Sequence, residues 1–133
     1  MQDGSAPSKT VTIERFCYGR SGSTVAANTL KSGQFLYNAN ADVVLNGHDH
    51  LYERFGPQAG DGRPDPARGI REFIVGTGGV NADYRFVTTK PNSEQRITGQ
   101  NGVLKLTLQA DSYQWEFVTV NGSVADSGTG QCH

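Results

Sequence analysis

Two closely spaced histidines, His48 and His50, are the side chains of this sequence best suited to chemistry. They are two of the three histidines among 133 residues, and they stand in the run Gly47-His48-Asp49-His50. On an extended or looped backbone, imidazoles at this spacing can face one metal ion or two adjacent ions. A glycine before them permits close backbone approach. The pair alone also fits ordinary surface histidines, which are the commoner case, so the flanking sequence must decide.

The residues before this pair predict a buried strand that ends at the histidines. Residues 41–45 read Ala-Asp-Val-Val-Leu, a short β-branched run that is typical of a buried strand. In open α/β sheets, ligand sites concentrate at the carboxyl ends of strands. We therefore expect His48 and His50 at the edge of a sheet.

The remaining patterns predict a mixed α/β fold with a predominantly antiparallel sheet. Five further segments have the pattern of strands: residues 10–16, 70–75, 102–109, 112–120 and 123–125. The third and fourth of these predict a β-hairpin. Residues 24–38 are compatible with one main helix, and residues 56–69, with three prolines and four glycines, predict a long surface loop. Residues 80–100 lack periodicity, so an irregular segment is expected there.

Three aromatic side chains alternate along the second strand of the predicted hairpin: Tyr113, Trp115 and Phe117. Interleaved aromatic residues can form a platform on which nucleic-acid bases stack. Alternation within a hairpin, however, places such side chains on one face of a sheet, where core packing is far commoner. We therefore predict that these three residues lie in the core.

Composition limits the partners and the compartment. The chain has 12 Lys+Arg and 13 Asp+Glu, a net charge of −1, and no basic block, so it lacks the electrostatic footprint of a nucleic-acid-binding protein. No apolar run approaches the roughly 20 residues that span a bilayer. Residues 1–15 contain no apolar region of the signal-peptide type. We expect a soluble chain without membrane or nucleic-acid partners, in a compartment that the sequence leaves unknown.

The two cysteines, Cys17 and Cys132, lie near opposite ends of the sequence. A disulfide between them would close a long loop and could add about 4 kcal/mol of stability if the geometry permits. Two unpaired thiols are an equal alternative, since two cysteines do not fix the redox compartment. The adjacent Cys132-His133 pair fits either a metal-ligand pair or a frayed tail, and we predict the frayed tail.

The run from Ala41 to Phe55, with its Asn46-Gly47-His48-Asp49-His50 core and the following Leu-Tyr-Glu-Arg-Phe, resembles the last metal-ligand motif of the calcineurin-like and purple-acid-phosphatase-like metallophosphoesterases. Residues 69–79 and the carboxyl-terminal hairpin look like the downstream part of bacterial secreted members. The resemblance covers roughly residues 21–133. It implies a fragment of the family's α-β-β-α sandwich, preceded by residues 1–20 as an arm and an unmatched strand.

That resemblance implies a two-metal centre that hydrolyses phosphoesters, in which Zn, Mn or Fe ions activate a hydroxide. His48 and His50 would each bind one of the two divalent transition metals and would thus be catalytic. Four neighbouring side chains would support this loop: Asp49, Tyr52, Glu53 and Arg54. Among these, Glu53 and Arg54 would orient the imidazoles. The alternative for Glu53 and Arg54 is a solvated ion pair.

Most of the family's metal ligands have no counterpart in this sequence. The Asp-x-His, Gly-Asp-x-x-Asp and Gly-Asn-His motifs are missing, and residues 16–20 read Phe-Cys-Tyr-Gly-Arg where the family has another histidine. Each metal needs roughly three or four protein ligands and a bridging carboxylate, so two imidazoles cannot hold a catalytic dinuclear site. We expect hydrolysis to be at most weak unless a homo-oligomer or a complementing amino-terminal half completes the site. The alternative is a non-catalytic metal-binding or self-associating module.

Overall fold

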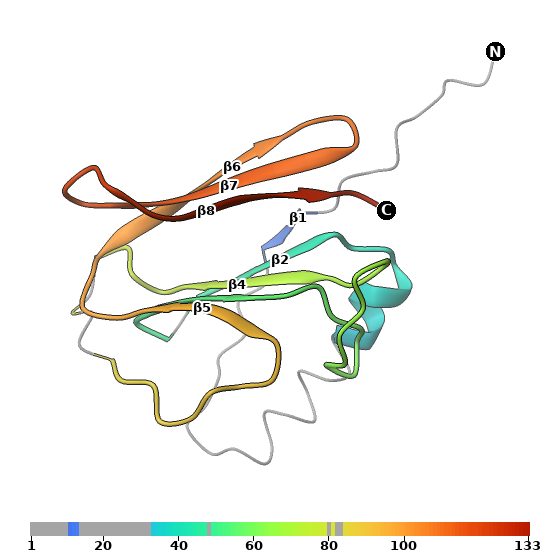
Figure 1. The fold of residues 1–133 in the computed structure, drawn as a ribbon, viewed down its shortest axis with the longest axis horizontal. Coiled ribbons are helices and arrows are strands. Elements are labelled where there is room, and N and C mark those ends of the chain that lie inside the picture. Colours follow the sequence, from blue (N-terminus) through green and yellow to red (C-terminus); the bar gives the residue numbers. More distant parts are fainter. Residues whose placement is uncertain (1–10, 14–32, 48, 80, 82–83) are drawn as a thin grey trace.

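Two β-sheets lie face to face in the computed structural model, which describes residues 11–13, 33–47, 49–79, 81 and 84–133 (Figure 1). Within these residues the first sheet has five strands: β1 (Val11–Ile13), β2 (Val43–Asn46), β3 (Tyr52–Phe55), β4 (Arg71–Val75) and β5 (Ser93–Ile97). The second sheet has three strands: β6 (Gly102–Leu108), β7 (Ser112–Thr119) and β8 (Val124–Gln131). The predicted fold class is confirmed by this arrangement.

The first sheet is mixed and the second is antiparallel. The strand order of the first sheet is β1-β2-β4-β3-β5. In this sheet β1, β2 and β4 run parallel, and β3 runs antiparallel to both β4 and β5. The second sheet is a β6-β7-β8 meander. Residues 33–38 are helical, and the remainder of the predicted helix, residues 24–32, lies outside the described residues. Among the described residues, no helix is long and apolar enough to cross a membrane.

The main core lies between the two sheets, because side chains alternate across each strand. Six buried residues form it, three from each sheet: Val43, Tyr52, Phe73, Tyr113, Trp115 and Phe117. The ring of Tyr52 stacks on that of Phe117 with centroids 4.2 Å apart. The prediction that the three aromatic residues of the hairpin pack in the core is therefore confirmed.

The opposite face of the first sheet carries two smaller apolar clusters. Leu36 of the short helix packs with Ala41, Val44 and Ile70 in one of them. The other contains Leu51, Phe55 and Ile74. Since neighbouring β2 residues such as Val43 and Val44 are both buried, this strand is covered on both faces, as its continuous apolar run predicts.

The sequence predicted most strands but missed two. No strand is predicted for the segment that forms β3, and residues 80–100 are expected to be irregular, whereas β5 occupies residues 93–97. β5 is polar and lies at the edge of its sheet, so it lacks the apolar alternation that marks a half-buried strand. β8 is longer than the predicted 123–125 strand. Residues 56–69 form a loop with isolated bridges from Gln58 to Pro64 and Ile70.

Candidate functional site

The loop that carries the two histidines follows the carboxyl end of β2, where the sequence predicts it. Asn46 ends β2, and the backbone enters β3 at Tyr52 after a tight bend in which Leu51 N donates to Asp49 O at 2.8 Å. Because β2 runs parallel to β4, their carboxyl ends meet at the same edge of the sheet. The loop therefore stands at the edge where α/β sheets place ligand sites.

Gly76, directly after β4, fixes the position of this loop. A Cβ atom at residue 76 would lie 1.9 Å from Asp49 O, a separation that no side chain tolerates, and a tight 3.3 Å from His50 N. Gly76 N also donates a hydrogen bond to Leu51 O at 3.2 Å. The backbone of β4 and the backbone of the histidine loop are thus in direct contact, and only glycine permits this approach.

The described part of the chain does not hold a complete metal site. His50 is half-buried, and its ring meets the edge of Tyr84 with centroids 6.3 Å apart. His48 lies outside the described residues, so its predicted role as a ligand stays a prediction. Among the described residues, no three His, Cys, Asp or Glu side chains gather closely enough to hold a metal ion. The described residues alone therefore do not fit a two-metal centre.

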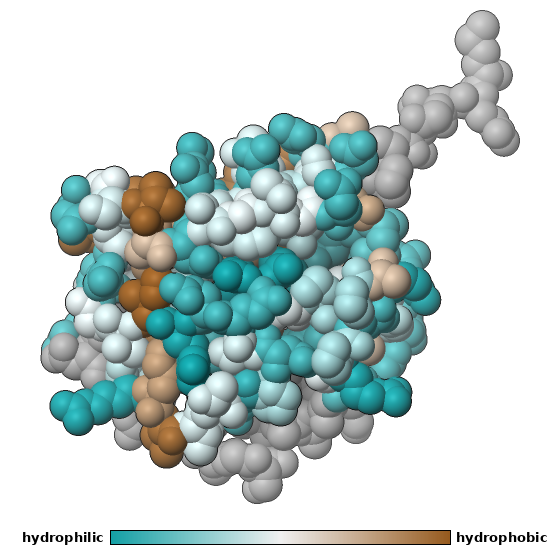
Figure 2. All heavy atoms as spheres, in the orientation of Figure 1, coloured by the Kyte–Doolittle hydropathy of each residue, from teal (hydrophilic) through white to brown (hydrophobic). Residues whose placement is uncertain are grey.

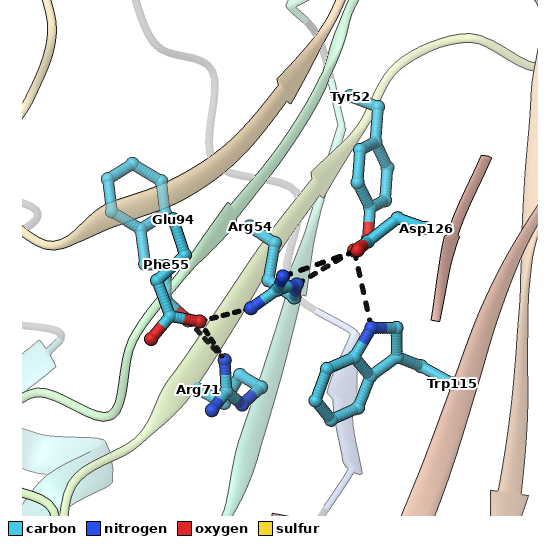
Figure 3. A network of polar contacts seen from close by, with 7 residues as sticks. All are labelled: Tyr52, Arg54, Phe55, Arg71, Glu94, Trp115 and Asp126. Atoms are coloured by element: carbon cyan, nitrogen blue, oxygen red, sulfur yellow. Dashed lines mark hydrogen bonds and ion pairs between the residues drawn. The ribbon is translucent and has the colours of Figure 1, made fainter. Parts of the chain in front are cut away.

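Tyr52 and Arg54 extend from β3 toward the second sheet and meet at the carboxylate of Asp126 on β8 (Figure 3). Tyr52 Oη donates to Asp126 Oδ2 at 2.6 Å. Arg54 Nε donates to the same oxygen at 2.7 Å and Arg54 Nη2 to Oδ1 at 3.2 Å. Trp115 Nε1 adds a fourth donor at 3.3 Å. Burial alone would raise the pKa of Asp126, but the bonds from Arg54 and Tyr52 outweigh it and lower that pKa.

A second carboxylate, that of Glu94 on β5, extends the same network. It accepts hydrogen bonds from Nη1 of Arg54 and, at 2.8 Å, from Nη1 of Arg71 (Figure 3). Both guanidinium groups lie over the Trp115 ring, with Cζ atoms 5.1 Å and 4.8 Å from its centroid. Two cations, two carboxylates and an indole thereby join β3, β4 and β5 to β7 and β8.

Glu53 lies on the other face of β3 and has different partners. Its carboxylate accepts a hydrogen bond from Ser93 Oγ at 2.6 Å, and burial raises its pKa. Because Arg54 pairs with Asp126 and Glu94, the alternative of a solvated ion pair between Glu53 and Arg54 is wrong. That Asp49, Tyr52, Glu53 and Arg54 support the histidines stays a prediction. The structure shows that Tyr52 and Arg54 also join the two sheets.

A buried polar cluster beside the histidine loop was not predicted. Asn46 Nδ2 donates to Glu72 Oε1 at 2.5 Å, and Gln58 Nε2 donates to Glu72 Oε2 at 3.3 Å. Asn46 Oδ1 is buried without a partner in the described structure. Burial raises the pKa of Glu72 above its ordinary value of 4.5. The sequence signal for this cluster was a glutamate within the strand run Arg71-Glu72-Phe73-Ile74-Val75. Charged residues are seldom buried without partners, so a glutamate there indicates a nearby polar partner.

Replacing Glu72 by Gln should remove a pH-dependent loss of stability. The raised pKa means that the folded protein holds this proton more tightly than the unfolded chain, so raising the pH through the folded pKa favours unfolding. We expect the stability of E72Q relative to wild type to increase as the pH rises from about 4.5. Urea unfolding of both proteins at several pH values measures this difference. A difference that does not change with pH would contradict the assignment.

The carboxyl-terminal residues are hydrogen-bonded to both sheets. Cys132 N donates to Asp111 O at 2.8 Å, and His133 N donates to Asp42 Oδ1 at 2.9 Å. Nδ1 of the His133 ring lies 3.1 Å from the same oxygen. The predicted frayed tail is therefore wrong, because the carboxylate of the residue directly before β2 holds it. Cys17 lies outside the described residues, so the disulfide and the two thiols both remain open.

Comparison with known proteins identifies the fold. No protein-family model matches the sequence, and no curated protein sequence matches it significantly. The purple acid phosphatase PPD1 from yellow lupin seeds superposes with a TM-score of 0.64 at 22% identity, over 73% of this chain and 19% of that chain. GAP50, the anchor in the inner membrane complex of Plasmodium, superposes with a TM-score of 0.62 at 18% identity, over 84% of this chain and 31% of that chain.

These likenesses establish a calcineurin-like, metallophosphoesterase-like fold. The chain spans only about a fifth and about a third of the lengths of the two matched structures. This chain shares the arrangement of its two sheets with those proteins. The activities of the whole proteins are a separate matter.

Proposed function

We propose that this chain is a metallophosphoesterase-like domain, similar to the downstream part of bacterial secreted members, that contributes two metal ligands, His48 and His50, to a divalent transition-metal site. One observation carries the proposal. The histidine loop lies at the carboxyl ends of two parallel strands and is held against β4 by a backbone contact that only Gly76 permits. Such a contact holds the loop backbone, including His50 N, in one position before any ligand arrives.

The proposed activity depends on ligands from outside this chain. Two imidazoles leave a divalent metal short of the protein ligands it requires. A second copy of this chain or a polypeptide carrying the missing carboxylates would complete the site, and phosphoester hydrolysis would follow only then. The chain alone should bind metal weakly and show little or no turnover.

The first test is the metal content of protein purified without chelator, together with hydrolysis of a generic aryl phosphate. We expect zinc, manganese or iron in the wild type and its loss in the double variant His48→Asn/His50→Asn, because asparagine keeps a polar side chain but removes both imidazoles. The metal affinity of the double variant should be at least about 10-fold lower than that of the wild type, because both imidazole ligands are lost. Circular dichroism spectra of the double variant would check that it is folded.

The matched control is Gln114→Ala, which changes an exposed side chain on β7, away from the histidine loop. It should retain the wild-type metal content. Equal metal content in the wild type and the double variant would show that the bound metal does not use these histidines. Wild-type protein with neither metal nor turnover would contradict the proposal.

A second candidate is a non-catalytic module that acts through its surfaces. The incomplete ligand set of the described residues favours it, as does the fold shared with GAP50, whose name describes an anchor. Figure 2 shows a largely hydrophilic face on which hydrophobic residues gather mainly in one narrow strip. On the second sheet, Val103 and Val124, 60% and 50% exposed, flank Val118 across the three strands. A second copy could cover this row, and sedimentation of the metal-free protein would reveal the dimer.

A further inference from the structure

A cavity on the side of the molecule near the carboxyl terminus is separate from the histidine loop. Its volume is about 250 Å³. One wall comes from the 56–69 loop, including Pro57, Pro66 and Ala67, and the other comes from the starts of β4 and β7, the end of β8 and the residues after it. Pockets for drug-sized ligands measure roughly 300–1,000 Å³, so this cavity suits a smaller molecule.

The loop wall is held in place by its own hydrogen bonds. Asp65 Oδ1 accepts bonds from the backbone of Ala67 at 3.2 Å and of Arg68 at 3.1 Å. Asp65 Oδ2 accepts one from Tyr37 Oη at 2.6 Å. Gly69 packs directly on the backbone of residues 57–58. The cavity is therefore bounded by a fixed wall, which reduces the entropy that a ligand would lose by ordering it.

Arg71 is the one side chain with a permanent charge among the residues that line this cavity, and the lining contains no Asp or Glu. The residue is 9% exposed. Nη1 is fixed by Phe55 O at 2.9 Å and by Glu94, and Cζ lies over Trp115. Arg71 Nε is buried with no hydrogen-bond partner in the described structure. An unpaired donor on a buried cation is costly and calls for an acceptor.

His133 also lines the cavity, and one of its ring nitrogens lacks a hydrogen-bond partner among the described residues. Its Nδ1 faces Asp42, and a hydrogen bond to that carboxylate requires the proton on Nδ1. Nε2 is buried with no partner among the described residues. This atom accepts a hydrogen bond when the ring is neutral and donates one when the ring is protonated. Tyr113 also lines the cavity; burial raises the pKa of its phenol, and the neighbouring Arg71 guanidinium partly offsets that rise.

We propose that this cavity binds a small oxyanion, a carboxylate or a phosphate, through Arg71 and His133. A guanidinium held in place, as Arg71 is by Phe55 O and Glu94, is the group that proteins use for planar carboxylates and for phosphates. The imidazole suits both kinds of anion, since it can accept a hydrogen bond from a hydrogen phosphate or donate one to a carboxylate oxygen. The site shares no residue with the proposed metal ligands.

The chain contains its own reporter for this binding. Trp115 is the single tryptophan, and Arg71 Cζ lies 4.8 Å from its ring centroid. An anion that contacts the guanidinium should change the fluorescence of this indole. We would titrate the full chain in EDTA, which removes bound metal, with inorganic phosphate in one series and acetate in another. Sodium chloride at matched ionic strength is the reference.

We expect a saturable fluorescence change and a rise in melting temperature with at least one of the two anions, and the tighter binder identifies the ligand class. Ala67→Glu should weaken binding by about 10-fold, because it adds a negative charge to the exposed cavity wall. Ala67→Gln is the matched control, with nearly the same size and no charge, and should bind as the wild type does. Both changes are at an exposed loop residue and should leave the fold intact.

Three outcomes would overturn the proposal. One is that neither anion produces a change beyond that of chloride. Another is that Ala67→Glu binds as tightly as Ala67→Gln, which would place the anion elsewhere. The third is that His48→Asn/His50→Asn abolishes binding in EDTA, which would assign the anion to the histidine loop. Survival of binding in that double variant supports the cavity whether or not the metal proposal holds.

Discussion

Replacing Asp126 by Ala is expected to destabilise the protein by about 3–5 kcal/mol, the cost of removing one partner of a buried ion pair. Its carboxylate, with a side chain 9% exposed, accepts bonds from Tyr52, Arg54 and Trp115. Its loss leaves a guanidinium that is 13% exposed without its principal partner. Urea unfolding followed through the single tryptophan measures the loss, because that indole is part of the network.

Glu116→Ala is the matched control for this prediction. It removes a carboxylate from an ion pair with Lys105 on the outer face of the second sheet, where both side chains are exposed. Exposed pairs contribute about 0–1 kcal/mol, so this variant should unfold almost as the wild type does. The double variant Asp126→Ala/Arg54→Met should be more stable than Asp126→Ala, since it no longer buries a cation that has lost its principal partner. Equal losses for Asp126→Ala and Glu116→Ala would contradict the role given to the network.

Replacing Gly76 by Ala is expected to displace the histidine loop and to weaken metal binding by about 10- to 100-fold, the range seen when residues that position metal ligands are changed. The new Cβ would overlap Asp49 O at 1.9 Å, and a clash with backbone cannot be relieved by rotating a side chain. The free energy of unfolding should also fall, by about 1–3 kcal/mol. Isothermal titration with zinc and urea unfolding measure the two effects.

Gly78→Ala provides a close control, two residues further along the chain. A Cβ at residue 78 would meet nothing within 4 Å, and the backbone there does not require glycine. This variant should retain both metal affinity and stability. If Gly76→Ala and Gly78→Ala behaved alike, the contact between β4 and the loop would not position the histidines.

The sequence predicted the strands in which buried side chains follow a simple pattern, either a continuous apolar run or an alternation of apolar and polar residues. Val43 and Val44 lie in a continuous apolar run, and Tyr113 and Trp115 alternate with polar residues, so the pattern of each strand follows from its own residues. The position of the histidine loop at the end of β2 followed from the same run.

β3 could not be predicted in this way because its charged residues are paired by distant segments. Glu53 and Arg54 are adjacent in sequence and lie on opposite faces of the sheet, where Ser93, 40 positions away, and Asp126, 72 positions away, are their partners. A local pattern contains no information about such partners, so two charged residues in a short run indicate an exposed loop. The docking of His133 onto Asp42, across 91 positions, was missed for the same reason.

The span of these contacts also sets an order of events during protein synthesis. Asp126 lies 72 positions after Arg54, and ribosomes add about 5–20 residues each second, so Arg54 emerges roughly 4–14 seconds before the carboxylate that neutralises it. During that interval the second sheet is incomplete, so it does not fully cover the inner face of the first sheet with Tyr52 and Phe73. The nascent chain should be most prone to aggregation, and most dependent on chaperones, until β8 has left the exit tunnel.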